Sequence, residues 1–201
     1  MKKFSSYALA LLVVSGMLLN GSMAEANAYR EKGKVFEIND SGLRVTPPRD
    51  WNRLAIKRGK FAETWTLDGE QLNDVTFYGG VETDKPLVKE RDKKRDPLPK
   101  FRSDTLLVEI PELVQGTYRA YKGISSFTMT NSKPGRFLGR DGIEFIYEFT
   151  DNDNLPRKGE GRAAIISGKL YMVTFDAPRL HYFERTRADF HALADTAFLA
   201  K

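Results

Sequence analysis

The chain has no cysteine among its 201 residues, and it has only two histidines. The absence of cysteine excludes disulfides, thiolate catalysis and cysteine-ligated metals. It also excludes a lipoprotein's acylated cysteine, although residues 18–22 resemble a lipoprotein processing site with Ser22 at the modified position. We expect His181 and His191 to occupy surface or helix-face positions rather than to share a metal.

Motifs for nucleophilic and phosphate chemistry are also missing. The sequence contains no Gly-x-Ser-x-Gly, so a serine triad has no anchor. Residues 159–161 read Gly-Glu-Gly, but they lack the third glycine of a dinucleotide loop and lead into a predicted strand. Residues 151–154 superficially resemble a calcium loop, but Pro156 and Arg162 stand where an EF-hand needs glycine and glutamate. No catalytic, cofactor-binding or metal-ligating residue is predicted.

Paired carboxylates are the one catalytic arrangement that the sequence leaves open. Glu144 and Glu148 share a face of one predicted strand, about 13 Å apart from strand rise alone. This distance is too long for a glycosidase pair. We therefore predict a protein that is not an enzyme, with a carboxylate-based hydrolase as a remaining alternative.

The chain has one long apolar run, and it lies near the N-terminus. Residues 7–19 follow Lys2 and Lys3 and precede small and polar residues, which is the layout of a secretory signal peptide. The run is short for a membrane span, which needs about 20 apolar residues. The alternative is an N-terminal core helix. We predict a signal peptide at 1–26, export to the periplasm or beyond the cell, and no transmembrane span in the mature chain.

The excess positive charge is concentrated in one segment. Removing residues 1–26 takes away two lysines and one glutamate, which lowers the net charge from +5 to +4. Residues 84–102 alone hold eight basic and four acidic side chains, so the rest of the mature chain is balanced. This pattern differs from the broad basic face of a nucleic-acid-binding protein.

We therefore predict a long, exposed, charged loop at residues 83–102. It is either a solvated insertion or an electrostatic contact for anionic lipid or an acidic partner. The candidate contact residues are Lys85, Lys89, Arg91, Lys93, Lys94, Arg95, Lys100 and Arg102.

A hairpin and a helix near the C-terminus organise the predicted fold. Two apolar runs, residues 162–166 and 169–175, flank Ser167-Gly168, which suits a tight turn. Both faces of the second run are mostly apolar, so we expect a central strand with a layer on each face. The Thr186–Asp189 spacing indicates a helix start. An apolar stripe then follows at helical spacing: Phe190, Leu193, Ala194, Ala197 and Phe198.

The rest of the chain predicts further strands and one more helix. Strands are expected at 34–38, 43–46, 51–56, 62–67, 74–81, 124–130, 137–138 and 142–150, with a loop at 131–136. Trp51 and Trp65 are expected in the core rather than stacked on a ligand. The second helix begins near Ile110 or kinks there because of Pro111, ends at Gly123, and would cover the other face of the sheet.

These patterns resemble a known family. Residues 138–145 (Leu-Gly-Arg-Asp-Gly-Ile-Glu-Phe) precede a polar turn, the 162–175 hairpin, Ala177-Pro178, aromatics at 182–183, and Phe190 in the last helix. Upstream, residues 42–45 with Pro47 to Trp51 match the same pattern. The chain thus resembles, over residues 41–199, the PsbP-like superfamily of extrinsic photosystem proteins and the related Mog-type and bacterial envelope proteins.

The resemblance implies an α+β fold, in which an antiparallel sheet is sandwiched between helices (α/β/α), in one domain over residues 27–201. It also implies an accessory or binding role rather than catalysis, and it transfers no binding residue. Our leading hypothesis is an exported, non-enzymatic accessory protein that binds another protein or an anionic envelope component. The alternative is a small-molecule or lipid carrier with a pocket between sheet and helix. No cofactor is predicted, and oligomeric state stays open.

Overall fold

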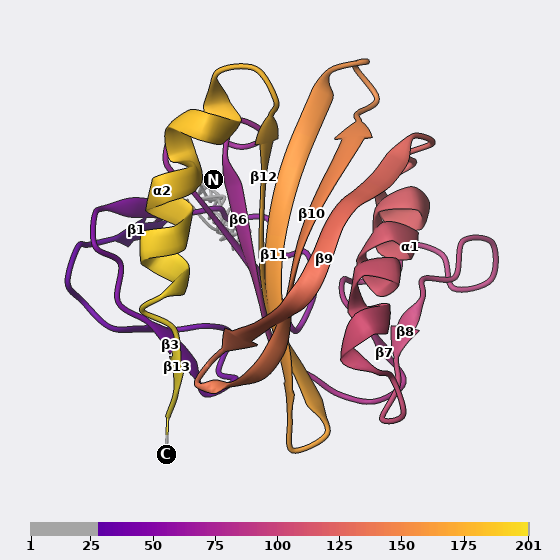
Figure 1. The fold of residues 1–201 in the computed structure, drawn as a ribbon, viewed down its shortest axis with the longest axis horizontal. Coiled ribbons are helices and arrows are strands. Elements are labelled where there is room, and N and C mark those ends of the chain that lie inside the picture. The colour runs from indigo at the N-terminus through magenta and orange to yellow at the C-terminus, as the bar shows by residue number, and fades with distance from the viewer. Residues whose placement is uncertain (1–27, 201) are drawn as a thin grey trace, which may run out of the picture.

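Eight antiparallel strands form the main sheet of the computed structural model, which describes residues 28–200 (Figure 1). The predicted signal peptide at 1–26 lies outside the described residues. The strands are β1 (Ala28–Arg30), β2 (Phe36–Glu37), β3 (Leu43–Val45), β4 (Trp51–Arg53), β5 (Ala62–Thr66), β6 (Asp74–Val81), β7 (Lys85–Pro86), β8 (Lys100–Phe101), β9 (Phe127–Phe137), β10 (Arg140–Thr150), β11 (Pro156–Ile166), β12 (Lys169–Pro178) and β13 (Phe198–Leu199). The helices are α1 (Ile110–Lys122) and α2 (Tyr182–Ala194), and a 3-10 turn, η1 (Leu107–Glu109), precedes α1.

The main sheet joins an early and a late part of the chain. Its order is β1-β4-β5-β6-β12-β11-β10-β9, so β6 and β12 meet at the centre. Two small sheets flank it, one of order β13-β3-β2 and one made of β7 and β8. Among the described residues, no helix is both long and apolar enough to cross a bilayer.

The predicted hairpin is confirmed. Strands β11 and β12 pair from Ile166–Lys169 outward, and Ser167 and Gly168 have φ angles of 51° and 72°. Two successive positive φ angles are typical of the type I′ turns that join strands tightly. Residues 170–178 of β12 are buried on both faces, as a central strand requires.

Each face of the sheet has its own core. The α1-side core includes Ile110, Val114 and Tyr118 with Leu170 and Met172 of β12. The α2-side core includes Phe183, Phe190 and Leu193 with Tyr171, Val173 and Phe175 of β12. Alternate side chains of β12 thus enter different cores, and Figure 1 shows the two helices on opposite sides of the sheet. Trp51 and Trp65 are fully buried in the α2-side core, which confirms the prediction for them.

The structure decides how α1 begins. It starts at Ile110, with Pro111 in its first turn, where proline's missing N–H removes no helical hydrogen bond. Gly123 caps its C-terminus in the left-handed conformation, with φ of 68°. The predicted end is confirmed, and of the two predicted starts the first is the observed one.

The prediction for the last helix was wrong at both ends. Helix α2 begins at Tyr182, and the Thr186 hydroxyl does not cap it, because that hydroxyl accepts a hydrogen bond from Asn73 Nδ2 at 3.3 Å. The helix ends at Ala194, and Phe198 belongs to β13, which pairs with β3. Only the first three members of the predicted stripe, Phe190, Leu193 and Ala194, are buried.

The loop predicted at residues 131–136 is also wrong. Strand β9 runs through it without a break, and Pro134 pairs in register with Ile143 of β10. Strand β9 lies at the edge of the sheet, where one row of backbone groups has no partner strand. Proline is tolerated there because the ladder loses no hydrogen bond on that side.

Residues 83–102, called here the basic segment, are more ordered than a long exposed loop. Strands β7 and β8 form a short ribbon across its two ends. Its four large apolar side chains, Leu87, Val88, Leu98 and Phe101, are buried in the α1-side core. The free energy gained by burying these side chains offsets the conformational entropy that is lost when the segment becomes ordered. The charge-rich composition of the segment does not by itself indicate this burial.

Candidate functional site

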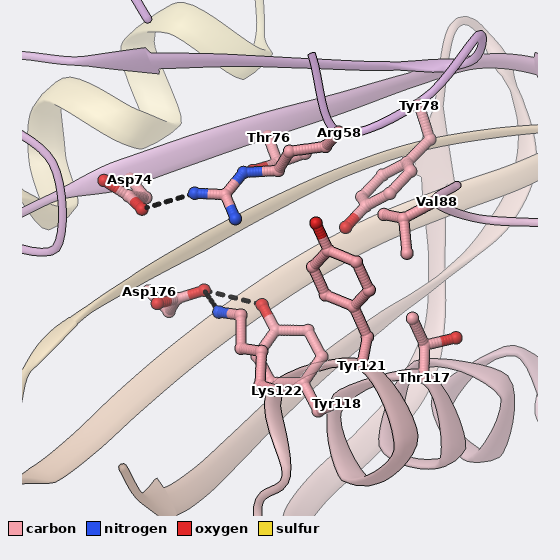
Figure 2. Close-up of a pocket in the computed structure, with 10 residues that line it drawn as sticks. All are labelled: Arg58, Asp74, Thr76, Tyr78, Val88, Thr117, Tyr118, Tyr121, Lys122 and Asp176. Atoms are coloured by element: carbon pink, nitrogen blue, oxygen red, sulfur yellow. Dashed lines mark hydrogen bonds and ion pairs between the residues drawn. The ribbon is translucent and has the colours of Figure 1, made fainter. Parts of the chain in front are cut away.

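A large cavity lies at one end of the main sheet, beside the C-terminus of α1. It is an open cleft of about 630 Å³, lined by charged and polar side chains with a few apolar ones. A chamber of about 20 Å³ adjoins it and extends under α1, and Figure 2 shows the ten side chains around this chamber. Such a chamber accommodates about one water-sized group.

Two carboxylates lie at the base of the cleft because of the strand register. Asp74 begins β6 and Asp176 lies near the end of β12, and these two residues are direct partners across the central strand pair. Paired residues in antiparallel strands project to the same face of the sheet. Asp74 is 5% exposed and Asp176 is 3% exposed, so both are buried.

Three cations from three other segments surround these carboxylates. Arg58, from the β4–β5 connection, donates through Nη2 to Asp74 Oδ2 at 3.3 Å and through Nε to Thr64 Oγ1 at 3.0 Å. Lys122 Nζ lies 3.6 Å from Asp176 Oδ2, and Arg157 Nη2 donates to Asp176 Oδ1 at 3.3 Å. These five residues, Arg58, Asp74, Lys122, Arg157 and Asp176, are called the charge cluster.

Tyrosines complete the cluster from the side of α1. The Tyr118 hydroxyl donates to Asp176 Oδ2 at 2.6 Å and lies 3.2 Å from the Tyr147 hydroxyl (Figure 2 shows the first contact). Burial, and after it the Asp176 charge, raises the pKa of both tyrosines well above the usual value. Both phenols therefore stay protonated and act as hydrogen-bond donors or acceptors.

Glycines in β11 make room for these rings. A Cβ atom at Gly159 would lie 2.2 Å from the Tyr147 ring, and one at Gly161 would lie 2.2 Å from the Phe145 ring. A larger residue at either position would have to displace an aromatic ring that is already buried. The Gly-Glu-Gly run thus serves packing, and it belongs to a strand rather than to a phosphate loop.

The two carboxylates have pKa values shifted in opposite directions. Burial, together with the Asp176 charge, raises the pKa of Asp74 to about 6, which outweighs the opposing effects of Arg58 and Lys122. Burial also acts to raise the pKa of Asp176, but Lys122, Arg157 and the Tyr118 hydrogen bond outweigh it and hold that pKa below its usual value. At neutral pH the cluster therefore holds one firmly ionised carboxylate and one that is close to its titration range.

The raised pKa of Asp74 predicts a pH-dependent stability. Because the folded pKa lies above the unfolded one, native Asp74 binds a proton more tightly, and its contribution is fully present below about pH 4. That contribution, about 3 kcal/mol, is lost as the pH rises from about 4 through about 6. Asp74→Asn should remove this part of the decline, measured by urea unfolding from pH 4 to pH 7.

Asp141→Asn is the matched control, because Asp141 is exposed near the start of β10. It should leave the pH profile of stability unchanged. The groups that face Asp74 are Asp176, Arg58 and Lys122, with a backbone N–H donated by Gln71. An Asp74→Asn profile parallel to that of the parent protein would contradict the assignment.

The residues predicted as a contact surface lie mostly away from the cleft. All eight are exposed: Lys85, Lys89, Arg91, Lys93, Lys94, Arg95, Lys100 and Arg102. Among them only Arg91 lines the cleft, with its Cζ atom 4.7 Å from the centre of the Tyr121 ring. Their contact with a partner stays a prediction.

The other polar residues considered from sequence do not converge. His191 Nε2 lies 2.6 Å from Glu160 Oε2 on the α2 side, while His181 precedes α2. Glu144 pairs with Lys133 at 3.2 Å and Glu148 with Arg179 at 3.6 Å. Within residues 28–200, no group of three or more histidines and acidic residues is placed to hold a metal.

Sequence reasoning missed the charge cluster. One local signal was present, since Met172, Thr174 and Asp176 alternate on the same face of an otherwise apolar strand. The predicted apolar run stopped at residue 175, but β12 continues to Pro178 and includes Asp176. A charged residue that continues such an alternation indicates a buried polar site.

Comparisons with known proteins give a fold but no close relative. No family model matches the chain, and no curated protein does. The solution structure of cyanobacterial PsbP (CyanoP) from Synechocystis aligns with a TM-score of 0.54 at 12% identity, covering 90% of this chain and 96% of that one. The crystal structure of LpqN, involved in cell envelope biogenesis of Mycobacterium tuberculosis, aligns with a TM-score of 0.38 at 8% identity, covering 89% and 88%. The chain therefore has a PsbP-like fold, as its sequence pattern predicted.

Proposed function

We propose that this chain is an exported, non-enzymatic accessory protein of the cell envelope, which binds an anionic envelope component through the basic segment. The PsbP-like fold and the N-terminal pattern of residues 1–26 support the general role. One observation carries the proposal: the basic side chains of the basic segment are exposed to solvent, while its large apolar side chains are buried in the α1-side core.

The anchoring of this segment favours a contact surface over a solvated insertion. Leu87 and Val88 on one side and Leu98 and Phe101 on the other are buried, and the β7–β8 ribbon joins the two ends. The stretch between them therefore projects from a fixed base. A charged surface that is ordered before binding loses less entropy when a partner arrives.

Most of these cations also lack an internal partner. Among the eight, and within the described residues, only Arg95 and Arg102 form ion pairs, with Asp92 and Asp104. The five lysines, Lys85, Lys89, Lys93, Lys94 and Lys100, are thus available to an external anion. Each lysine near an anionic surface contributes about 1 kcal/mol.

A variant that neutralises part of this surface tests the proposal. Replacing Lys89, Lys93, Lys94 and Lys100 with glutamine should reduce capture by envelope extracts at least about tenfold at about 0.1 M salt. The parent protein should lose most of its capture at about 1 M salt, because exposed charges are then screened. Pull-down of the mature protein at the two salt concentrations provides the measurement.

A matched control removes positive charge elsewhere. Arg140 and Lys169 are exposed at the first positions of β10 and β12, and neutralising them should change capture little. Urea unfolding of each variant verifies that the fold is intact. Capture that is unchanged in the four-lysine variant and insensitive to salt would reject the basic segment as the contact surface.

The cleft supports a second candidate, a small-molecule carrier with a pocket between sheet and helix. Its volume of about 630 Å³ is within the range of ligand sites, which is roughly 300–1,000 Å³. The charged lining favours a polar ligand over a lipid chain. A hydrolase is less well supported, because Asp74 and Asp176 are buried and engaged by cations and hydrogen-bond donors, which leaves neither carboxylate for a substrate.

A further inference from the structure

We propose that the cleft binds an organic cation, namely the guanidinium or alkylammonium group of a polar ligand. This site is separate from the lysines of the basic segment and has the opposite charge preference. Four features of the cleft carry the inference: its charge balance, the helix end on one wall, the aromatic faces, and a guanidinium that the chain itself already places there.

The charge balance of the cleft differs from that of the whole chain. Although the chain has a net charge of +5, the cleft lining contains four basic and five acidic side chains. The buried acids are largely used within the charge cluster, whereas two acids of the rim, Glu70 and Asp153, are exposed. Glu70 Oε1 lies 3.6 Å from Arg58 Nη2, with its side chain 38% exposed. Asp151 is held more firmly, since its Oδ1 accepts hydrogen bonds from the backbone N–H groups of Asp153 and Leu155. Asp153 is exposed and forms no ion pair within residues 28–200.

The lining of the cleft also includes the C-terminal turn of α1. Residues 120–123, which end this helix of 13 residues, line the cleft. The carbonyls at a helix C-terminus act as a partial negative charge that stabilises a nearby cation. At the end of α1 the Lys122 carbonyl already accepts a hydrogen bond from Asn152 Nδ2 at 3.0 Å. The acidic side chains and the helix end therefore favour the same sign of ligand charge.

Aromatic faces near the cleft already contact cations. Lys122 Nζ lies 4.1 Å from the centre of the Tyr118 ring and 5.5 Å from that of Phe149. Arg91 places its guanidinium over Tyr121, at the rim of the cleft. Arg91 is exposed and forms no ion pair among the described residues, so a guanidinium from outside would displace it at little cost.

An anionic ligand fits the same cleft less well. The three cations of the charge cluster are already engaged: Arg58 by Asp74, Lys122 by Asp176, and Arg157 by Asp176 and the Gln71 carbonyl. An incoming anion would have to displace these carboxylates or approach the acidic rim. A cation instead meets the exposed acids of the rim, Glu70 and Asp153, and Asp153 forms no ion pair within residues 28–200.

A matched pair of probes tests the sign of the charge. N-acetyl-arginine amide and N-acetyl-citrulline amide have nearly the same shape, but only the first carries a charge. Titration of the mature protein, followed by backbone NMR shifts, should show binding of the arginine probe at residues 120–123 and 151–153. The citrulline probe should bind at least about tenfold more weakly, since the helix end and the aromatic face each contribute a fraction of this difference.

Variants of exposed residues at the rim of the cleft test binding without destabilising the fold. Glu70→Gln combined with Asp153→Asn should weaken binding of the arginine probe about fivefold or more, while Asp141→Asn, distant in the fold, should not. Arg91→Ala should strengthen binding, because it removes the internal competitor. Agmatine in place of the arginine probe distinguishes a free small cation from a basic side chain in a peptide, and tighter binding of either supports the site.

Equal binding of the two probes, or no binding of either cation at millimolar concentration, would overturn the inference. Weaker binding in Arg91→Ala would also overturn it, because Arg91 would then be part of an anion site. None of these results bears on capture through the lysines of the basic segment, so the two proposals fail independently.

Discussion

Replacing Asp176 with alanine should lower the free energy of unfolding by about 3–5 kcal/mol. Asp176 is the shared partner of Lys122, Arg157 and the Tyr118 hydroxyl, and it is 3% exposed. Its removal leaves Lys122 and the buried Tyr118 hydroxyl without their main acceptor. Arg157 keeps the Gln71 carbonyl and Asp151 as partners. Urea unfolding at pH 7 measures the loss. The slope of the unfolding free energy against urea concentration should be the same in both proteins, which shows that unfolding exposes the same surface area.

A surface carboxylate provides the control. Glu148 lies 3.6 Å from Arg179, and both side chains are substantially exposed, so Glu148→Ala should cost less than about 1 kcal/mol. Asp176→Asn, which keeps the volume but removes the charge, separates electrostatics from packing. A loss below about 1 kcal/mol in Asp176→Ala would show that the charge cluster is not held together by this carboxylate.

Asp74 should reduce the loss of stability that follows the replacement of Asp176. The Asp176 charge contributes to the raised pKa of Asp74, so its removal lets Asp74 ionise more readily. Ionised Asp74 would then take over part of the compensation of Lys122 and Arg58. Combining Asp74→Asn with Asp176→Asn should therefore cost more than the sum of the single changes, as expected for residues of one network.

Local patterns explain why part of the fold was predictable. The β11–β12 hairpin follows from two apolar runs around Ser167-Gly168, a signal confined to one short stretch. The central place of β12 follows from its two apolar faces. The start of α1 was predicted only as two alternatives, because proline is compatible with both a first turn and a kink.

Long-range pairing explains why the charge cluster was not predictable. Asp74 and Asp176 meet only because β6 pairs with β12, which joins distant parts of the chain. Arg58 and Lys122 arrive from a loop and a helix end, where a charged residue is ordinary in sequence. No single segment contains enough of the cluster to indicate it.

Contacts between distant parts of the chain also explain the wrong predictions at residues 83–102 and at Phe198. Composition predicted an exposed loop at residues 83–102, yet burial of Leu98 and Phe101 depends on α1, which follows later in the chain. Helical spacing placed Phe198 in the last helix, whereas pairing with β3 makes it a strand. Where a segment can form either a helix or a strand, its tertiary contacts decide between them rather than the local spacing of its apolar residues.

Phe190→Ala should also destabilise the protein strongly, by about 3–5 kcal/mol. Phe190 is fully buried, and its ring centroid lies 5.2 Å from that of Phe175 on β12. Phe183 stacks on the same ring at 5.2 Å, so α2 is joined to the central strand through a stack of three aromatic rings. Truncation would leave a cavity that the rigid sheet cannot close, and thermal or urea unfolding measures the loss.

Phe198→Ala is the matched control, because both residues belong to the helical stripe predicted from sequence. Phe198 is 41% exposed in β13, so its truncation should cost less than about 1 kcal/mol. Folded Phe190→Ala protein should still be captured by envelope extracts, since the basic segment belongs to the opposite core. Similar losses for the two phenylalanines would mean that the α2-side core does not depend on the aromatic stack.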